Sequence, residues 1–393
     1  MGILEFHHDC QTKTLRVYGS VVEDFLTPIG LDHVDRLCAD TGILEHAEGA
    51  IGRREHGYCT DDVARQLLVA SLYEQDDAAQ RIAEQALEFL RHAHLPNVGF
   101  RSRMNYARIW QDDGASDDAS GRALWGLGVA AQNAPWAHVR RAALDLFDRA
   151  SHFRSRFWHA TAFATLGAQA IIECFPDNTG AEELLFAASR SLPKIPGESA
   201  WNWHESKLTY ASPVLADALL AISFVDPSRT DEALGLLRWL STVLVKNGRL
   251  SAVPTGGLSQ SDARPGFDQQ PIEAQAFASA AWRAWLLTEE RFWLELVVIS
   301  ASWFFGHNDS SVPLIDRGTQ GCCDGLQRGG RNENQGAEST LAMLHVMAIL
   351  ERAVANGAVV LQLGRGCELK PNVEPRFNWT LDAAPISESK IQV

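Results

Sequence analysis

Hydrophobic residues recur at three- and four-residue spacing along most of this chain, which is the pattern that amphipathic α-helices produce. Hardly any stretch alternates between apolar and polar positions as a half-buried strand would. The chain is therefore predicted to be all-α, with little or no β-structure. The predicted helices are Leu31–Glu45, Asp61–Glu74, Asp77–His92, Ala119–Gln132, Trp136–His152, Phe157–Cys174, Ala181–Leu192, Pro213–Phe224, Thr230–Lys246, Ile272–Leu287, Glu289–Phe305 and Gly336–Ala353.

The links between these helices differ in length. Some are very short, such as Gln75–Asp76 and Thr288. Others run for about twenty residues or more, a length that is uncommon inside compact domains and usually functional. These long loops are 95–118, 191–212, 247–271 and 307–335. A short link makes two helices antiparallel neighbours, so short and long links in alternation predict helical hairpins whose long loops gather at one end.

The helices are of two kinds. Segments such as GRALWGLGVAAQ and ATAFATLGAQA are rich in small residues, which allow a helix to pack closely on two sides, as in an inner ring. Segments such as QRIAEQALEFLRH and HVRRAALDLFDRA have one apolar and one charged face, as helices of an outer ring should. Six inner and six outer helices make an (α/α)6 toroid of six helical hairpins. The alternative is an open α-solenoid of helical pairs, but the long, strongly patterned loops favour the closed toroid.

We assign the toroid to residues 28–355 as a single domain. Residues 1–27 are expected to form an N-terminal strap, with a short strand around Thr14–Tyr18. Residues 356–393 contain several prolines among scattered polar residues and are expected to form an irregular C-terminal tail.

The long loops deliver acids, amides and aromatic residues just before or within the first turn of the small-residue helices. The segments are HGYCTDD (56–62), WQDDGASDDASGR (110–122), WNWHESKLTY (201–210), FDQQPIE (267–273) and NENQGAE (332–338). Helix capping alone explains any single acid, because Thr60 and Ser116 suit the N-cap position and the acids that follow complement the helix dipole. Asp61 and Arg65 are also spaced as a salt-bridge pair on a helix.

Together, however, these segments would converge on one cavity, because the N-termini of the inner helices of a toroid meet at one end. Amide side chains donate and accept hydrogen bonds as sugar hydroxyls require, and a cavity with aromatic walls and a few polar groups suits a carbohydrate. Cleavage of a glycosidic bond needs one carboxylic acid to protonate the leaving oxygen and one carboxylate to activate water or attack the sugar. We expect this acid and base among Asp62, Asp118 and Glu205, with Asp61 and Asp268 as the next candidates. The expected sugar-binding residues are His56, Tyr58, Trp110, Arg122, Trp203, His204, Gln269, Gln270, Asn334 and Glu338.

Composition narrows the possible partners. The 393 residues include 35 Lys plus Arg and 49 Asp plus Glu, and the net charge of −14 argues against nucleic acid or an anionic membrane surface. The N-terminus shows no export signal, and the 7 cysteines form no Cys-x-x-Cys motif, so a cytoplasmic protein without a disulfide framework is expected. His56, His159 and His204 do not have metal-ligand spacing, and we expect neither a metal nor a cofactor. The expected partner is an oligosaccharide or monosaccharide substrate, and the oligomeric state is left open.

Five segments carry a resemblance to a known family. GYCTDDVAR, SDDASGRALWGLG, WHESKLTYASP, FDQQPIEAQA and NENQGAESTLAML resemble the helical domain that often accompanies, or is itself named, a bacterial glycosyltransferase. That domain is similar to the six-hairpin glycosidase-like superfamily, and the likeness spans residues 28–355 with its blocks in order. The resemblance implies the toroidal fold and sugar binding. The transferase name comes from neighbouring domains, and this chain has no Gly-rich fingerprint that follows a strand, as a nucleotide-sugar domain would show.

These observations favour a glycoside hydrolase. One alternative is a sugar epimerase or isomerase that uses His204 or His56 as its base. Another is a non-catalytic glycan-binding subunit that assists a separate glycosyltransferase.

Overall fold

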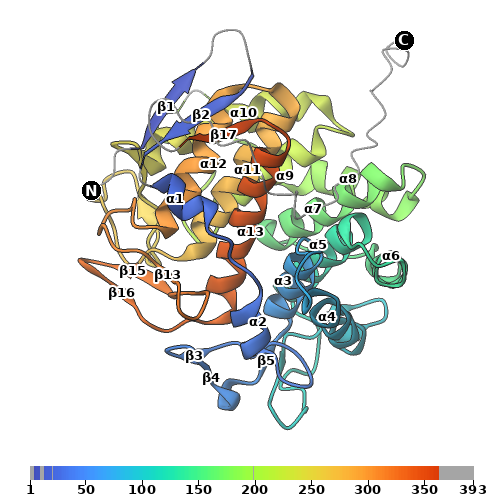
Figure 1. Cartoon of the computed structure of the whole chain (residues 1–393). Helices are drawn as coiled ribbons and strands as arrows, with labels where there is room; N and C mark the ends of the chain where they lie inside the picture. Colours follow the sequence, from blue (N-terminus) through green and yellow to red (C-terminus); the bar gives the residue numbers. More distant parts are fainter. Residues whose placement is uncertain (1–3, 9–12, 20, 198, 363–393) are drawn as a thin grey trace.

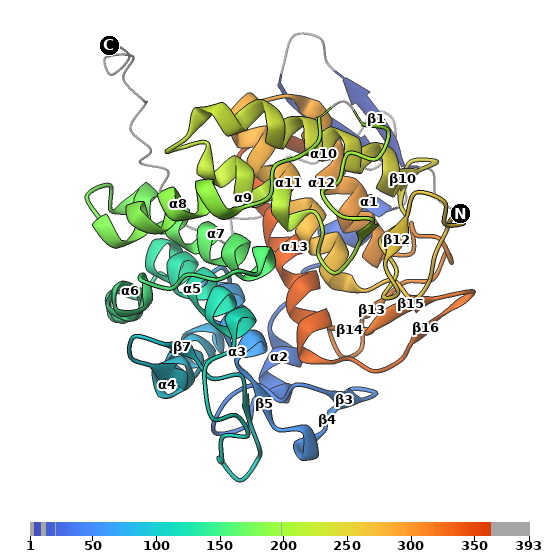
Figure 2. The same ribbon diagram turned by 180° about the vertical axis from the view of Figure 1, so that it is seen from behind.

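The computed structural model describes residues 4–8, 13–19, 21–197 and 199–362, and its helices alternate between an inner and an outer position (Figure 1). The inner helices are α3 (Thr60–Ala70), α5 (Asp117–Asn133), α7 (Trp158–Cys174), α9 (Val214–Ile222), α11 (Pro271–Thr288) and α13 (Ala337–Ala355). The outer helices are α4 (Ala79–Ala93), α6 (Ala137–Ala150), α8 (Thr179–Ser191), α10 (Thr230–Leu244) and α12 (Arg291–Phe304). Figure 2 shows α4, α6 and α8 on the outside of α3, α5 and α7. Two short helices, α1 (Val21–Leu26) and α2 (Asp32–Leu37), precede the ring.

The ring of inner helices is closed. Each inner helix packs against the next one along the chain, and α13 packs against α3 to complete the circle. The Tyr73 hydroxyl, just after α3, donates a hydrogen bond of 2.9 Å to the carbonyl oxygen of Leu344 in α13. The predicted (α/α)6 toroid is therefore confirmed, and the open solenoid is excluded.

Small residues in the inner helices allow this close packing. A Cβ atom at Gly167 of α7 would lie 2.1 Å from the carbonyl oxygen of Leu124 in α5. A Cβ atom at Gly126 of α5 would lie 2.4 Å from the carbonyl oxygen of Ala64 in α3. Because these contacts involve backbone atoms, a larger residue would force the helices apart.

The short helix α2 stands in the position of the sixth outer helix, and it is much shorter than predicted. The sequence predicts a helix over Leu31–Glu45, but α2 ends at Leu37 and the chain then turns back on itself. The amide of Ala39 donates to the carbonyl oxygen of Gly42, and Cys38 and Ile43 form an isolated β-bridge. The prediction was wrong because the apolar spacing of 31–45 belongs to a short helix and a tight turn, both packed on the same core.

The termini of the described chain meet in a three-stranded sheet. The strand predicted near Thr14–Tyr18 is confirmed as β2 (Leu15–Tyr18), which pairs antiparallel with β1 (Glu5–His8). It also pairs parallel with β17 (Val359–Gln362), so the tail predicted to be irregular from residue 356 starts with a strand. The rest of that tail, residues 363–393, lies outside the described residues.

Short strand pairs tie the long loops together at the end where the inner helices begin. These are β3 (Ala47–Glu48) with β4 (Ile51–Gly52), β5 (Tyr58–Cys59) with β8 (Arg103–Met104), β6 (His94–Leu95) with β7 (Gly99–Phe100), β9 (Lys207–Leu208) with β12 (Leu258–Ser259), β13 (Ile315–Asp316) with β14 (Gly321–Cys322), and β15 (Gly325–Gln327) with β16 (Gly330–Asn332). The pair β10 (Val245–Lys246) and β11 (Arg249–Leu250) follows α10. Two 3-10 turns, η1 (Arg54–His56) and η2 (Pro227–Arg229), complete the described elements.

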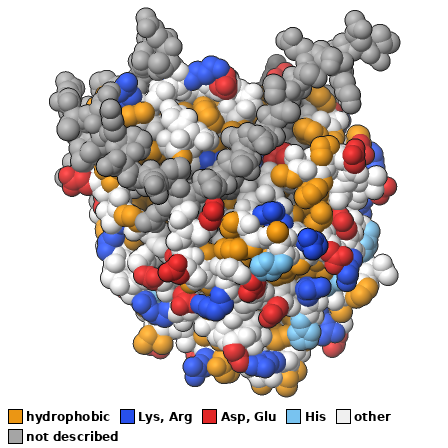
Figure 3. All heavy atoms as spheres, turned by 45° about the vertical axis from the view of Figure 1, so that its right-hand side comes forward, with side chains coloured by type: hydrophobic (Ala, Val, Ile, Leu, Met, Phe, Trp, Pro, Cys, Tyr) orange, Lys and Arg blue, Asp and Glu red, His pale blue; other side chains and the backbone are white. Residues whose placement is uncertain are grey.

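Two surface properties bear on possible partners. Among the described helices, none combines the length and apolar character that a bilayer crossing requires. On the face shown in Figure 3, acidic and basic side chains are interspersed and do not gather in one basic area.

Candidate functional site

A cluster of charged side chains surrounds the hydroxyl group of Tyr210. Arg65 of α3 and Arg122 of α5 each donate a hydrogen bond to this oxygen, at 2.8 and 2.6 Å. The hydroxyl in turn donates to Oε2 of Glu338 in α13, at 3.1 Å, and the same carboxylate oxygen accepts from Arg65 at 2.6 Å. One tyrosine thus connects three inner helices through charge-assisted hydrogen bonds, which are stronger than neutral ones.

The backbone of the same segment is held by two further inner helices. His159, in the first turn of α7, donates from Nε2 to the carbonyl oxygen of Tyr210 at 2.7 Å. Glu273, in the first turn of α11, accepts from the amide of Ala211 at 2.6 Å. Tyr210 and Ala211 themselves directly precede α9, which is the sixth inner helix. The N-terminal ends of all the inner helices therefore meet at this segment, as the toroid model requires.

Asp61 and Asp118 lie beside this cluster in different environments. Asp61 is half-buried, and its Oδ1 atom is buried without a hydrogen-bond partner. Burial raises the pKa of the Asp61 carboxyl; the charges of Arg65 and Arg122 oppose the rise, and that of Asp118 adds to it. Asp118, in the first turn of α5, is exposed to solvent. The two carboxyls are thus close enough to interact, and burial favours the protonated form of Asp61.

Arg122 is a buried cation that retains hydrogen-bonding capacity. Its side chain is 2% exposed, and its guanidinium carbon lies 3.5 Å from the centre of the Phe163 ring. Its Nη1 atom is buried with no hydrogen-bond partner. Burial, and then the charge of Arg65, lower the pKa of Arg122. A ligand oxygen that accepted from this nitrogen would remove the cost of an unpaired buried donor.

Glu273 is a buried carboxyl that burial holds in its neutral form. It is 5% exposed, and its Oε2 atom is buried without a partner. Burial raises the pKa of Glu273 to about 8, although the hydrogen bond from Ala211 opposes the rise. At neutral pH this side chain is a carboxylic acid, which can donate a hydrogen bond as well as accept one.

Asp62, the first predicted catalytic acid, faces the loops and not the cluster centre. It is 4% exposed, and its Oδ1 atom accepts from Arg65 at 2.7 Å. Burial raises the pKa of Asp62 to about 8. Its carboxylate also lies with Glu45 and Cys59 in a group whose potential ligand atoms are within 4.8 Å of one another. A metal fits this group poorly, because Arg103 binds both oxygens of Glu45, Arg65 binds Asp62, and burial raises the pKa of the Cys59 thiol.

Another predicted group lies at the edge of the cluster. Trp203 is 2% exposed and packs against Trp158, whose ring stacks on His159. The ring of His204 contacts both Trp158 and Trp203, and burial lowers the pKa of His204. Glu205 is exposed, and its carboxylate lies 3.7 Å from Nε2 of His204. Burial lowers the pKa of the neighbouring His159, and the charge of Glu205 opposes that effect.

Some predicted sugar-binding residues form hydrogen bonds that connect loops. Gln269 is fully buried; its amide group donates to Asp309 at 2.7 Å and to the carbonyl oxygen of Gly266 at 2.8 Å, and its side-chain oxygen accepts from the amide of Ala252 at 3.2 Å. Asn334 accepts from the amide of Gly49 at 3.0 Å. Both polar groups of the Gln269 side chain therefore have partners within the protein, and so does the side-chain oxygen of Asn334.

The remaining predicted residues, all within the described part of the chain, form no hydrogen bond or ring contact with Tyr210 and lie on the surrounding loops. Tyr58 is 1% exposed and packs beneath Tyr106, while Trp110 packs on the outer helix α4. His56 packs edge-on against His46. Asp268 is exposed in the loop before α11, and Gln270 occupies the N-cap position of that helix. The structure therefore brings together Asp61, Asp62, Asp118, Arg122 and Glu338, with Trp203, His204 and Glu205 at the edge.

Sequence reasoning missed four members of the cluster. Tyr210 and Glu273 ended two of the singled-out segments, and Arg65 lies one turn after Asp61, so position along the chain was an available signal for these three. His159 was weighed only as a metal ligand, and its place in the first turn of a small-residue helix was the signal that could have found it.

Comparison with known structures identifies the architecture. A cellobiose 2-epimerase from Bacillus thermoamylovorans is similar over 84% of this chain and 99% of its own, with a TM-score of 0.63 and 13% identity. A GH76 α-mannanase from Bacteroides thetaiotaomicron matches 86% of this chain and 96% of its own, with a TM-score of 0.57 and 11% identity. An inactive α-1,6-mannanase variant from Salegentibacter, in complex with α-1,6-mannotriose, matches 84% and 97%, with a TM-score of 0.53 and 12% identity. Models of protein families and curated protein sequences give no match.

At these identities the similarity establishes the fold alone. The chain has the (α/α)6 toroid fold of these structures, which is the fold that the sequence resemblance implied.

Proposed function

We propose that this protein is a carbohydrate-active enzyme, and that it is a glycoside hydrolase whose acid and base are Asp61 and Asp118. The observation that carries the proposal is the unequal environment of these two carboxyls at the mouth of the ring. Asp61 is half-buried with a raised pKa, whereas Asp118 is exposed to solvent. An acid with a raised pKa beside a second, accessible carboxyl is the arrangement that glycoside hydrolysis requires.

In this mechanism Asp61 protonates the oxygen of the leaving sugar. Asp118 accepts a proton from water or attacks the sugar carbon, according to the separation of the two groups across the bound sugar. Arg122 donates from its unpaired Nη1 atom to a sugar oxygen, and Asp62 holds the guanidinium of Arg65 in place. We therefore assign Asp62 a positioning role in place of the predicted catalytic role, because its burial and its ion pair with Arg65 keep it from the substrate.

The similar structures support a sugar substrate in this fold. Of the three, one is an epimerase of a disaccharide and two are mannanases. The inactive mannanase variant has two adjacent aspartates replaced by asparagine. This chain also has adjacent aspartates at the start of inner helices, in Asp61–Asp62 and Asp117–Asp118.

One observation favours a second candidate, a sugar epimerase or isomerase. His159 donates from Nε2 to the carbonyl oxygen of Tyr210, so its Nδ1 atom carries the lone pair in the neutral ring. Burial lowers the pKa of His159 and favours that neutral form. A neutral imidazole beside the guanidinium of Arg122 could remove a proton next to a carbonyl, and the guanidinium would stabilise the resulting oxyanion. His204 and His56 are the alternative bases.

The test compares turnover of manno- and gluco-oligosaccharides by the wild type, Asp61→Asn and Asp118→Asn. We expect released sugars from the wild type and a rate at least a hundredfold lower in either variant, because each removes one half of the acid–base pair. Asp113→Asn, an exposed acid in the loop before α5, is the matched control and should retain the wild-type rate. Equal turnover in all four proteins would refute the assignment.

A parallel assay incubates mannose and cellobiose with the enzyme in D2O and follows exchange of the C2 hydrogen by NMR. Exchange that is lost in His159→Gln, without any bond cleavage, would establish the epimerase. Binding of oligosaccharide without turnover or exchange would instead favour the non-catalytic glycan-binding subunit.

A further inference from the structure

The turn that carries Tyr210 has a backbone conformation that its sequence does not favour. This turn spans residues 209–212, directly before α9, and the amide of Ser212 donates to the carbonyl oxygen of Thr209 at 3.3 Å. The third residue, Ala211, has a φ of 49°, whereas the φ of Tyr210 is not positive. A positive φ at the third residue alone defines a type II turn, which normally has glycine at that position. The turn is therefore of type II, with an alanine in the glycine position.

The left-handed conformation is unfavourable for an alanine. The contact between Cβ and the carbonyl oxygen disfavours this region about five- to thirtyfold for residues other than glycine. A type I turn has a negative φ at both central residues and differs mainly in the orientation of the peptide unit between them. Local preferences would therefore reverse the peptide unit that joins Tyr210 to Ala211, so groups outside the turn must hold it in the observed orientation.

Two side chains from neighbouring inner helices hold this peptide unit. Its carbonyl oxygen, which belongs to Tyr210, accepts from Nε2 of His159 at 2.7 Å. Its amide, which belongs to Ala211, donates to Oε1 of Glu273 at 2.6 Å. The carbonyl and the amide of a peptide unit point in opposite directions, so reversal of the unit would break both hydrogen bonds at once.

The surroundings of Glu273 leave Ala211 without an alternative acceptor. Ala211 is 1% exposed and Glu273 is 5% exposed. Ala211 belongs to a small buried apolar cluster, separate from the main core, with Ile272, Ala276 and Ala342. None of these side chains can accept a hydrogen bond. Loss of the Glu273 carboxyl would therefore leave a buried amide unpaired in the type II turn, in addition to the left-handed alanine.

The orientation of this peptide unit bears on the direction of Arg122. The Tyr210 hydroxyl accepts from Arg122 at 2.6 Å and donates to Glu338 at 3.1 Å. Reversal of the peptide unit changes the backbone torsion angles next to the tyrosine and displaces this hydroxyl. The guanidinium of Arg122 would then lose the partner that orients its unpaired Nη1 atom.

We propose that Glu273 is a positioning residue of the reaction centre. It holds the peptide unit between Tyr210 and Ala211 in the type II orientation, and so keeps the Tyr210 hydroxyl on Arg122. Glu273 acts through the turn and does not contact the sugar, and His159 is the second anchor of the same unit. The role in the reaction rests on the proposed function, whereas the role in the turn does not.

The kinetic experiment measures kcat/KM of the full chain for the oligosaccharide that the wild type hydrolyses. Glu273→Leu removes the acceptor but fills the space among apolar neighbours, and kcat/KM should fall about tenfold or more. Glu273→Ala, which cannot overpack the site, should behave in the same way. Glu273→Gln retains an oxygen that can accept from Ala211, so its kcat/KM should stay within about threefold of the wild type.

A second substitution tests whether Glu273 acts through the turn. In the double variant Glu273→Leu/Ala211→Gly, glycine adopts the left-handed conformation without the steric cost, so kcat/KM should recover at least about threefold over Glu273→Leu. A purely structural role of Glu273 predicts a further decrease instead, because glycine adds freedom to the unfolded chain.

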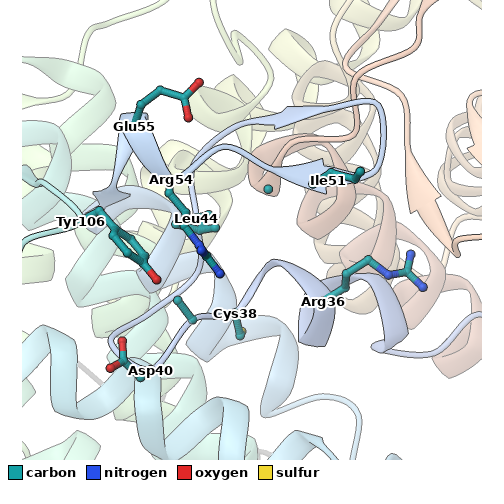
Figure 4. Close-up of a pocket in the computed structure, with 10 residues that line it drawn as sticks. Arg36, Cys38, Asp40, Leu44, Ile51, Arg54, Glu55 and Tyr106 are labelled. Carbon is teal, nitrogen blue, oxygen red and sulfur yellow. The ribbon is translucent and has the colours of Figure 1, made fainter.

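Glu55 provides the matched control. It is an exposed acid on η1 that accepts from Nε of Arg53 at 2.7 Å. It lies at a recess of about 760 Å3 outside the ring, whose lining shares no residue with the Tyr210 cluster (Figure 4). Glu55→Leu and Glu55→Gln should both retain the wild-type kcat/KM.

Crystal structures of the wild type, Glu273→Gln and Glu273→Leu test the turn without any activity. We expect a positive φ at residue 211 in the first two and a negative φ in Glu273→Leu, with the Tyr210 hydroxyl displaced from Arg122. An unchanged turn in Glu273→Leu would overturn the proposal. Wild-type kcat/KM in Glu273→Leu, equal losses in Glu273→Leu and Glu273→Gln, or no recovery in the double variant would also overturn it. If the wild type hydrolysed no oligosaccharide, the hydrolase proposal would fail, and the φ of residue 211 would still decide this one.

Discussion

The buried carboxyl of Glu273 should make stability depend on pH, and Glu273→Gln should remove that dependence. The pKa of Glu273 is raised from 4.5 to about 8 by burial, so between these values the folded protein holds a proton that the unfolded chain releases. Stability contributed by this group is therefore full below pH 4.5 and is lost as the pH rises through 8. Glutamine is neutral at every pH and can still accept the hydrogen bond from Ala211.

The size of the effect follows from the same shift. This rise in the pKa of Glu273 lowers the free energy of unfolding, relative to its value below pH 4.5, by about 3 kcal/mol at pH 7 and by about 5 kcal/mol well above pH 8. Glu273→Gln should thus match the wild type near pH 4.5 and exceed its free energy of unfolding by a few kcal/mol at pH 9.

Urea denaturation at pH 5, 7 and 9 measures this difference, with the intrinsic fluorescence of the 12 tryptophans as the signal. Subtracting the two curves isolates Glu273 from other titrating groups such as Asp62, which both proteins retain. Glu182→Gln, an exposed acid on α8, should follow the wild type at each pH. Wild-type and Glu273→Gln curves that stay parallel from pH 5 to 9 would refute the reasoning.

Three further outcomes are expected. Tyr210→Phe removes the hydroxyl that accepts from both Arg65 and Arg122, so kcat/KM should fall at least tenfold. The free energy of unfolding, measured by urea denaturation, should fall by only about 1–2 kcal/mol, because solvent reaches this side chain and can replace the lost hydrogen bonds. Gly167→Ala should lower the free energy of unfolding by about 3 kcal/mol in the same assay, because the new Cβ atom would lie 2.1 Å from a backbone oxygen. Its control is Gly235→Ala on α10, where a Cβ atom would have nothing within 4 Å; this variant should be neutral or stabilising by up to about 1 kcal/mol. Hydrolysis should decline on the alkaline side as Asp61 loses its proton, and a rate that rises steadily with pH would contradict its role as the acid.

Much of the fold was predictable from the sequence because helix periodicity and small-residue content are properties of single segments. The inner helices are confirmed with boundary errors of a few residues. The segment 31–45 was misassigned because its apolar spacing fits a helix equally well, while the turn at Gly42 is stabilised by packing that periodicity does not report. The pairing of β17 with β2 joins distant parts of the chain, and a local pattern cannot reveal it.

The location of the candidate site was predictable from the sequence, but the role of each residue in it was not. Asp61 and Asp62 are adjacent on a helix and so point in directions about 100° apart. Composition cannot tell which of the two faces the cluster. Gln269 and Tyr58 show a similar limit, because an amide or a phenol that ties loops together has the same identity as one that contacts a ligand.

The sheet that joins β2 to β17 has a consequence for how this ring could be joined to other proteins. The helix α13 runs from the mouth of the ring to the opposite end, where β17 leaves it (Figure 1). A protein joined to the chain after β17 would therefore start from the base of the toroid, at the end opposite the Tyr210 cluster.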